Sequence, residues 1–118
     1  MTNSNIYGTF MIEIKEYVDS NGSSPFAIWF DALDTVAALK INTYVTRIGQ
    51  GNFSQVKGVG NGVLECRIGW GAGFRVYLGQ DGETLVILLG GGTKKRQQQD
   101  IAKAKERWLD YKKRKKKI

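Results

Sequence analysis

The chain has 118 residues, of which 42% are hydrophobic, and this size and composition suit one domain with a single core. One cysteine, Cys66, excludes an internal disulfide framework, and a chain without histidine essentially excludes a zinc site built from nitrogen and sulfur ligands. No apolar run approaches the roughly 20 residues that span a bilayer, and the first ten residues lack a secretory pattern. We therefore expect a cytoplasmic protein without a membrane partner.

Positive charge is concentrated at the C-terminal end. The formal net charge is +7, but residues 90–118 hold twelve Lys and Arg against three acidic residues, a local charge of +9. Residues 1–89 hold six basic and eight acidic residues, a local charge of −2. A nearly neutral body with a strongly basic last quarter is typical of a protein that binds a polyanion. The alternative is that the terminal lysine run serves solubility alone.

The first half of the chain predicts a strand followed by two helices. Residues 1–10 are polar and are expected to be a flexible extension, and the alternation within 11–18 predicts a half-buried strand. Ser24 followed by Pro25 is the expected start of a short amphipathic helix that ends near residue 33. A second helix starts with Asp34 as its cap and ends at the glycines that follow Ile48. These helices are expected to pair and pack on a sheet.

The second half predicts four strands and a last helix. The strands are expected at 53–57, 63–68, 73–79 and 84–89, with Asp81-Gly82 as a tight hairpin between the last two. Gly90-Gly91-Gly92 is then expected to be a flexible break, followed by a helix from Asp100 to about Lys113. Because the helices are segregated from the strands, the fold class is α+β. The domain is expected to span 11–113, with 114–118 as a basic tail.

Strand alternation assigns side chains to the two faces of the sheet. Cys66 and its neighbours two residues away point into the core, which leaves Arg67 on the opposite face with Arg75 and Tyr77. A symmetrical hairpin places Arg67 directly opposite Arg75, and Glu65 opposite Tyr77. Two like charges at this spacing destabilise a sheet unless an anion lies between them, and paired guanidinium groups match a phosphate. Alternatively, Glu65 bridges both arginines in an ordinary surface network.

Other residues could extend this surface toward RNA. Trp70, in the glycine-rich loop after the second of these strands, could stack on a base or instead pack at the core edge or an interface. Lys94, Lys95 and Arg96 follow the glycine run, and their spacing is not that of a nucleotide-binding P-loop. Contact with an RNA backbone is the better use of these three cations.

The available residue types limit any catalysis. Without histidine, the usual acid–base pair for RNA cleavage is absent, and scattered acidic residues disfavour a two-metal centre. What remains is stabilisation of a phosphorane by arginine and lysine, with Tyr77 or a lysine moving a proton. No cofactor is expected.

Three segments together resemble the central motif of RelE/ParE-superfamily toxins, most closely the HigB-like "addiction module killer protein" branch that is also found among phage-derived proteins. They are Leu64-Glu65-Cys66-Arg67-Ile68, Gly71-Ala72-Gly73-Phe74-Arg75-Val76-Tyr77, and Leu88-Leu89-Gly90-Gly91-Gly92-Thr93-Lys94 with Gln97 and Asp100-Ile101 after it. The resemblance covers about residues 11–111. The sequence departs from the family in having Phe74 where a tyrosine is common and Thr93 where an aspartate is usual.

The resemblance implies a RelE-like toxin fold with an N-terminal strand, helical hairpin, antiparallel sheet and C-terminal helix. It also implies a cognate helix-turn-helix antitoxin and a toxin that cleaves mRNA on the ribosome. The matching positions make Arg67, Arg75, Tyr77 and Lys94 the candidate catalytic residues. Lys57, Trp70, Lys95 and Arg96 are the candidate RNA-binding residues. Two alternatives stay open: a ParE-like inhibitor of DNA gyrase and a non-catalytic RNA-binding protein.

Overall fold

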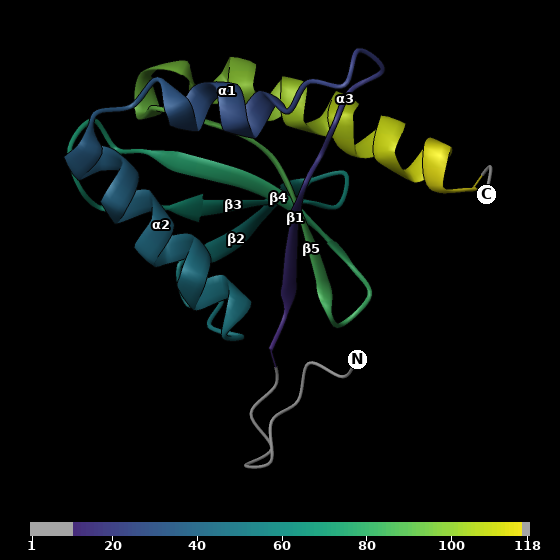
Figure 1. Cartoon of the computed structure of the whole chain (residues 1–118), viewed down its shortest axis with the longest axis horizontal. Coiled ribbons are helices and arrows are strands. Elements are labelled where there is room, and N and C mark those ends of the chain that lie inside the picture. The colour runs from purple at the N-terminus through teal and green to yellow at the C-terminus, as the bar shows by residue number, and fades with distance from the viewer. Residues whose placement is uncertain (1–10, 117–118) are drawn as a thin grey trace.

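The computed structural model describes residues 11–116, so the predicted extension at 1–10 lies outside the described residues. Figure 1 shows one sheet with helices on both faces. The elements in chain order are β1 (Glu13–Glu16), α1 (Pro25–Asp31), α2 (Thr35–Gly49), β2 (Val56–Gly60), β3 (Val63–Arg67), β4 (Arg75–Asp81), β5 (Leu85–Gly92), a 3-10 turn (Lys94–Arg96) and α3 (Gln97–Lys116). The α+β class is confirmed.

The five strands form a mixed sheet in the order β1-β5-β4-β3-β2. Strands β2 to β5 are antiparallel neighbours, which confirms the predicted four-strand meander, and β1 runs parallel to β5 at the edge. The predicted bounds of the first meander strand, 53–57, were wrong, because β2 spans Val56–Gly60. The predicted starts of α1 and α2 are also confirmed. Ser24 Oγ accepts a hydrogen bond from the backbone N–H of Ala27, and Asp34 Oδ1 accepts one from Ala37, which satisfies a free donor in each first turn.

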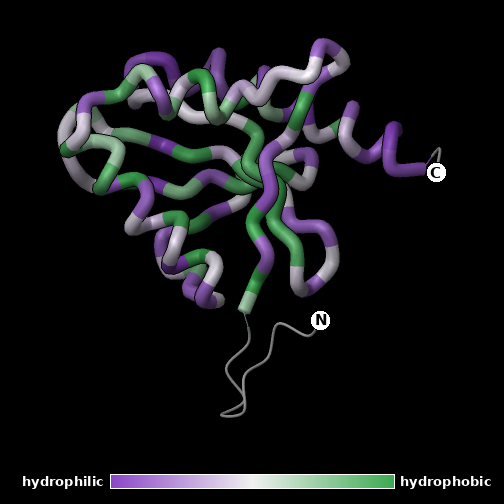
Figure 2. The backbone as a smooth tube through the Cα atoms, viewed as in Figure 1, coloured by the Kyte–Doolittle hydropathy of each residue, from purple (hydrophilic) through white to green (hydrophobic). Residues whose placement is uncertain are grey.

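Two apolar cores lie on opposite faces of the sheet, so the expectation of a single core was wrong. Helices α1 and α2 cover one face, where Phe26, Ile41 and Ile48 pack against Cys66 and its neighbours on the strands. Helix α3 covers the other face, and its Ala104 and Trp108 pack against strand residues that include Tyr77. Figure 2 shows hydrophobic segments along the strands and a hydrophilic C-terminal end of α3. None of the helices within residues 11–116 is long and apolar enough to cross a membrane.

The glycine run Gly90–Gly92 belongs to β5, so the prediction of a flexible break there was wrong. Packing on both faces explains the glycines. A Cβ on Gly91 would collide with the indole of Trp29 from α1, and a Cβ on Gly92 would collide with the carboxylate of Asp100 from α3. Glycine therefore allows two side chains to lie directly against the strand, and it does not loosen the chain here.

Helix α3 is longer than the sequence indicated. It begins at Gln97 instead of Asp100 and continues to Lys116, so residues 114–116 of the predicted basic tail are helical. The ion pair between Asp81 and Lys115 and the hydrogen bond from Tyr111 to Asp81 tie this end of the helix to the β4–β5 turn. The cationic end of α3 is thus held in place against the sheet.

Candidate functional site

Basic residues lie in one row across the end of three strands, which we call the cation row: Arg67, Arg75 and Lys94. Arg67 on β3 lies directly opposite Arg75 on β4, as predicted, and Arg75 lies opposite Gly92 on β5. Lys94 follows two residues after Gly92, and its backbone N–H donates to the carbonyl of Ala72 at 3.4 Å. The antiparallel register therefore brings together three cations that are far apart in sequence.

The members of the cation row differ in their access to solvent. The side chain of Arg67 is 54% exposed, and Lys94 is also exposed, but Arg75 is only 4% exposed. Tyr77, which was expected to share an open surface with these arginines, is 1% exposed because α3 covers it. The expectation of an open face that presents Arg67, Arg75 and Tyr77 together is therefore wrong for Arg75 and Tyr77.

A buried carboxylate bridges the two arginines. Glu65, which is fully buried, places Oε2 3.7 Å from Nε of Arg75 and Oε1 3.9 Å from Nε of Arg67. The side-chain amide of Gln97, in the first turn of α3, donates to Glu65 Oε2 at 2.8 Å. The bridging role that was considered for Glu65 is what the structure has, although it lies in the interior instead of on the surface.

Hydrogen bonding under the start of α3 is incomplete. Glu65 Oε1, Arg75 Nε and Tyr77 Oη are buried without a hydrogen-bond partner, while Arg75 Nη1 donates to the carbonyl of Gly73 at 2.6 Å. Burial, followed by the charge of Glu65, raises the pKa of Tyr77 well above its ordinary value. The phenol is therefore neutral at physiological pH and has no direct path to a substrate at the surface.

The predicted RNA-binding residues remain at the surface. Lys95 and Arg96 follow Lys94 in the exposed 3-10 turn. Lys57 on β2 is also exposed, and its backbone lies opposite that of Glu65 on β3. Trp70 is 37% exposed. One face of its indole stacks on Phe74 at a centroid distance of 6.2 Å, with an angle of 23° between the rings. The ammonium of Lys40 on α2 lies 5.9 Å from the centroid of the Trp70 ring.

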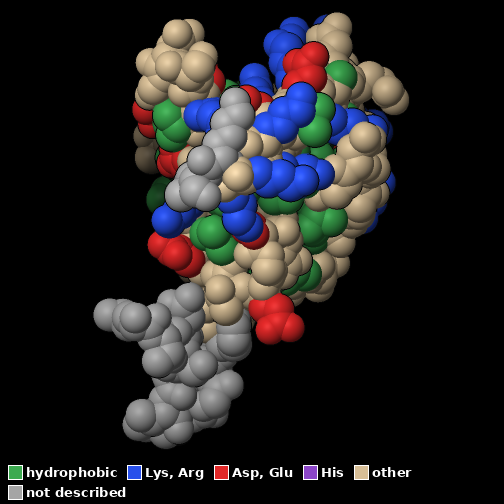
Figure 3. Space-filling model, turned by 90° about the vertical axis from the view of Figure 1, so that its right-hand side faces the viewer, with side chains coloured by type: hydrophobic (Ala, Val, Ile, Leu, Met, Phe, Trp, Pro, Cys, Tyr) green, Lys and Arg blue, Asp and Glu red, His purple; other side chains and the backbone are tan. Residues whose placement is uncertain are grey.

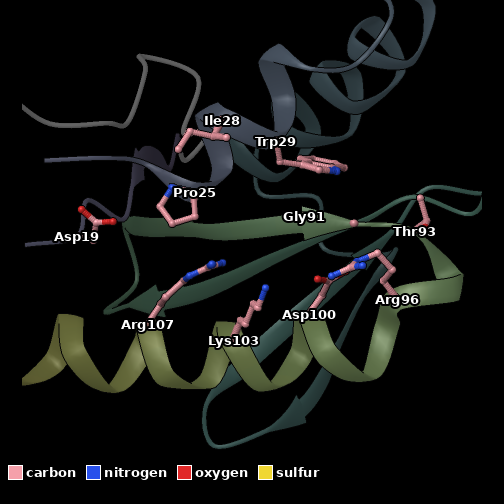
Figure 4. Close-up of a pocket in the computed structure, with 11 residues that line it drawn as sticks. Asp19, Pro25, Ile28, Trp29, Gly91, Thr93, Arg96, Asp100, Lys103 and Arg107 are labelled. Carbon is pink, nitrogen blue, oxygen red and sulfur yellow. The ribbon is translucent and has the colours of Figure 1, made fainter. Parts of the chain in front are cut away.

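A second group of residues was not expected from the sequence. A cleft of about 450 Å³ opens between α1, the end of β5 and α3, and we call it the α1–α3 cleft. Figure 4 shows Lys103 and Arg107 reaching from α3 toward β5, with Trp29 on the opposite wall. The spacing of Asp100, Lys103 and Arg107 indicates that they share one face of α3. The sequence did not indicate that this face lies across the cleft from Trp29 on α1.

The surface near the end of α3 is strongly basic. Figure 3 looks onto the C-terminal end of α3 and shows Lys and Arg side chains gathered around it. Toward the start of the helix, within residues 11–116, Lys94, Lys95, Arg96, Lys103 and Arg107 have no carboxylate within 4.0 Å. Cations that are not neutralised by the protein itself favour contact with a polyanion.

No family model matches the chain. The chain is 44% identical over 81 residues to an uncharacterized protein of Haemophilus influenzae, and the aligned part covers 68% of this chain and 82% of that protein. The chain belongs to the same family as this uncharacterized protein. This kinship supports a shared fold, and the activity has to be argued from the site.

Proposed function

We propose that this protein is the toxin of a type II toxin–antitoxin pair and acts as a metal-independent endoribonuclease on ribosome-bound mRNA. The observation that carries the proposal is the cation row, in which Arg67 and Lys94 stay exposed on either side of the anchored Arg75. Its supporting context is the resemblance of the same segments to RelE- and HigB-like toxins. A phosphate that enters this row meets positive charge from two directions.

The proposed reaction is attack of a ribose 2′-hydroxyl oxygen on the adjacent phosphorus, with the hydroxyl proton passing to water. The bond from phosphorus to the 5′ oxygen breaks, which leaves a 2′,3′-cyclic phosphate and a 5′-hydroxyl. Arg67 stabilises the negative charge that develops on the phosphorane, and the ammonium of Lys94 protonates the departing 5′ oxygen. The ribosome positions the 2′-hydroxyl for in-line attack, so that little is required of the isolated protein.

Arg75 serves this site as a positioning residue. Its guanidinium is held by the carbonyl of Gly73 and by the charge of Glu65, and Glu65 in turn is held by Gln97. Because the Arg75 side chain is already fixed, its positive charge raises the electrostatic potential at Arg67 and Lys94, and Arg75 loses no conformational entropy when the substrate binds. In this proposal Arg75 acts indirectly, and Tyr77, which was also expected to touch the RNA, takes no part in the reaction.

The proposed antitoxin would bind exposed apolar side chains on α1 and α2. Ile28, Val36 and Leu39 on α1 and α2 are 65%, 56% and 62% exposed, so these two helices leave three large apolar side chains open to a partner. An amphipathic segment of a helix-turn-helix antitoxin would bury these side chains.

A gyrase-directed inhibitor is the second candidate, because the burial of Arg75 and Tyr77 removes two groups expected to act on RNA. Induced expression in bacteria, followed by separate measurement of transcript integrity and plasmid supercoiling, distinguishes the two functions. We expect cleaved transcripts with unchanged supercoiling for the natural sequence. Lys94→Gln should abolish cleavage, whereas Lys113→Gln, a matched change at an exposed lysine of α3, should not. Intact transcripts with trapped gyrase–DNA complexes would refute the nuclease proposal.

A further inference from the structure

The α1–α3 cleft lies where the sheet has an open edge. Strand β1 pairs with β5 only as far as Leu88, where the N–H of Tyr17 donates to the Leu88 carbonyl at 2.9 Å. Beyond this point, residues 89–92 of β5 have no neighbouring strand on that side within the described part of the chain. Helices α1 and α3 form the two walls, so the backbone of β5 lies along the floor (Figure 4).

Three cations line the α3 side of the cleft without an ion-pair partner among residues 11–116. Lys103 and Arg107 are four residues apart on α3 and share one face, and Arg96 precedes them in the 3-10 turn. Arg107 Nη1 donates to the carbonyl of Leu89 at 2.9 Å, which fixes the guanidinium and leaves its other N–H groups to bind a ligand. Arginine held in this way is well suited to a phosphate.

The opposite end of the cleft combines an aromatic ring with a buried acceptor. The indole of Trp29 lies against Gly91, and the carboxylate of Asp100 lies against Gly92 from the other side. Asp100 Oδ2 is buried without a hydrogen-bond partner. Burial raises the pKa of Asp100, and the charges of Arg96, Lys103 and Arg107 lower it. Trp29 and Asp100 both line the cleft from opposite faces of β5, so an aromatic ring and a carboxylate are available to a flat ligand that carries N–H groups.

We propose that the α1–α3 cleft binds a nucleotide. The phosphate lies at Lys103 and Arg107, and the base lies against Trp29 with its N–H groups toward Asp100. The volume of about 450 Å³ is that of an ordinary small-molecule site. The positive charges of Arg96, Lys103 and Arg107 outnumber the one negative charge of Asp100, so an anion can be accepted in the cleft. This proposal does not depend on nuclease activity, since the cleft is separate from Arg67.

A peptide strand is the main competing occupant of an open sheet edge. Strand addition needs the free carbonyls of β5, but Arg107 already occupies that of Leu89, and a Cβ at Gly90 would come within 2.7 Å of Arg107 Nη1. Arg107 therefore lies over the face of β5 at Gly90, and with Trp29 over the other face at Gly91 it narrows the space for a peptide that would extend the sheet. The same placement makes its guanidinium available to a phosphate.

The experiment is a calorimetric titration of the full chain with adenosine 5′-monophosphate, adenosine, inorganic phosphate and a short single-stranded RNA. We expect adenosine 5′-monophosphate to bind more tightly than either adenosine or phosphate alone. Lys103→Gln and Arg107→Gln should each weaken binding about tenfold, the size expected for one charge-assisted hydrogen bond. Gln at 107 keeps a donor for the Leu89 carbonyl, and Lys103 is exposed, so both variants should fold.

The matched control is Lys113→Gln, an exposed lysine on α3 that does not line the cleft. Tighter binding of the RNA than of the mononucleotide, with the same loss in Lys103→Gln, would identify an RNA chain as the source of the nucleotide. Equal affinities for Lys103→Gln and Lys113→Gln, or phosphate binding as tightly as the mononucleotide, would overturn the proposal. Neither result bears on cleavage, which is tested separately through Lys94.

Discussion

The carboxylate of Glu65 lies 3.7 Å from Nε of Arg75, and both side chains are buried between the sheet and α3. Removing one partner of a buried ion pair leaves the other charge without compensation, which is costly even where the pair itself contributes little. Arg75 therefore depends on Glu65 to remain in the interior, and the position of the cation row depends on both.

Glu65→Gln should lower the free energy of unfolding by about 3 kcal/mol, because the charge of Arg75 stays buried without its counter-ion. Glutamine keeps an oxygen that can accept from Gln97, so the change tests the charge and not the hydrogen bond. Urea unfolding measures the effect, with the exposed Glu83→Gln as the control. Equal midpoints for the two variants would contradict this account of Glu65.

Gly79→Ala should destabilise the protein by about 1–3 kcal/mol, because a Cβ at this position on β4 would collide with the indole of Trp108. Gly58→Ala on β2 is the matched control, since a Cβ there meets nothing within 4 Å. Thermal unfolding of the two variants provides the comparison. A loss of stability in Gly58→Ala as large as that in Gly79→Ala would show that strand glycines matter here for a reason other than packing against α3.

Cys66 should be nearly unreactive in the folded protein. It is 2% exposed, and burial, with the charge of Glu65 adding to it, raises its pKa to about 11. At pH 8 only about one thiol in a thousand is then ionised, and the thiolate is the reactive form. Labelling with a thiol-specific disulfide reagent should be at least about a hundredfold slower than in urea. Complete labelling of the native protein at the rate of the unfolded chain would show that Cys66 is not enclosed in the core.

Asp81 should make stability depend on pH on the acid side. Hydrogen bonds from Lys115 and then Tyr111 lower the pKa of Asp81, so its contribution is present above the ordinary carboxyl pKa and is lost as pH falls through the lowered value. Asp81→Asn should therefore cost about 1 kcal/mol at pH 7 and progressively less in acid. The exposed Asp31→Asn is the control, and urea midpoints measured between pH 7 and pH 3 supply the test. A constant difference across this range would contradict the linkage.

Much of the sheet was predictable because its side chains alternate clearly. The alternation through Cys66 and through Val76 identified the core face, and the register of Arg67 opposite Arg75 followed from the loop centred on Gly71. The starts of α1 and α2 were predictable from Ser24 and Asp34 because side-chain caps are local. These features depend only on residues close together in the chain.

The burial of Arg75 and Tyr77 was not predictable, because it depends on where α3 packs. The helix has an apolar stripe that includes Ala104 and Trp108, but its spacing does not say which face of the sheet it covers. For the same reason Gly91 and Gly92 suggested flexibility, although they accommodate Trp29 and Asp100 from opposite sides. The α1–α3 cleft likewise brings together segments that no local pattern connects.

The exposed members of the cation row are proposed to cleave RNA. Arg67→Gln tests this most directly, because the Arg67 side chain is 54% exposed and its loss should leave the fold intact. Purified protein would be incubated with programmed ribosomes, and the mRNA ends would be mapped and quantified. We predict fragments with 2′,3′-cyclic phosphate and 5′-hydroxyl ends, a rate about a hundredfold lower for Arg67→Gln, and an unchanged rate for Arg47→Gln, an exposed arginine on α2. Equal cleavage by both variants, or no cleavage by the natural sequence, would contradict the claim.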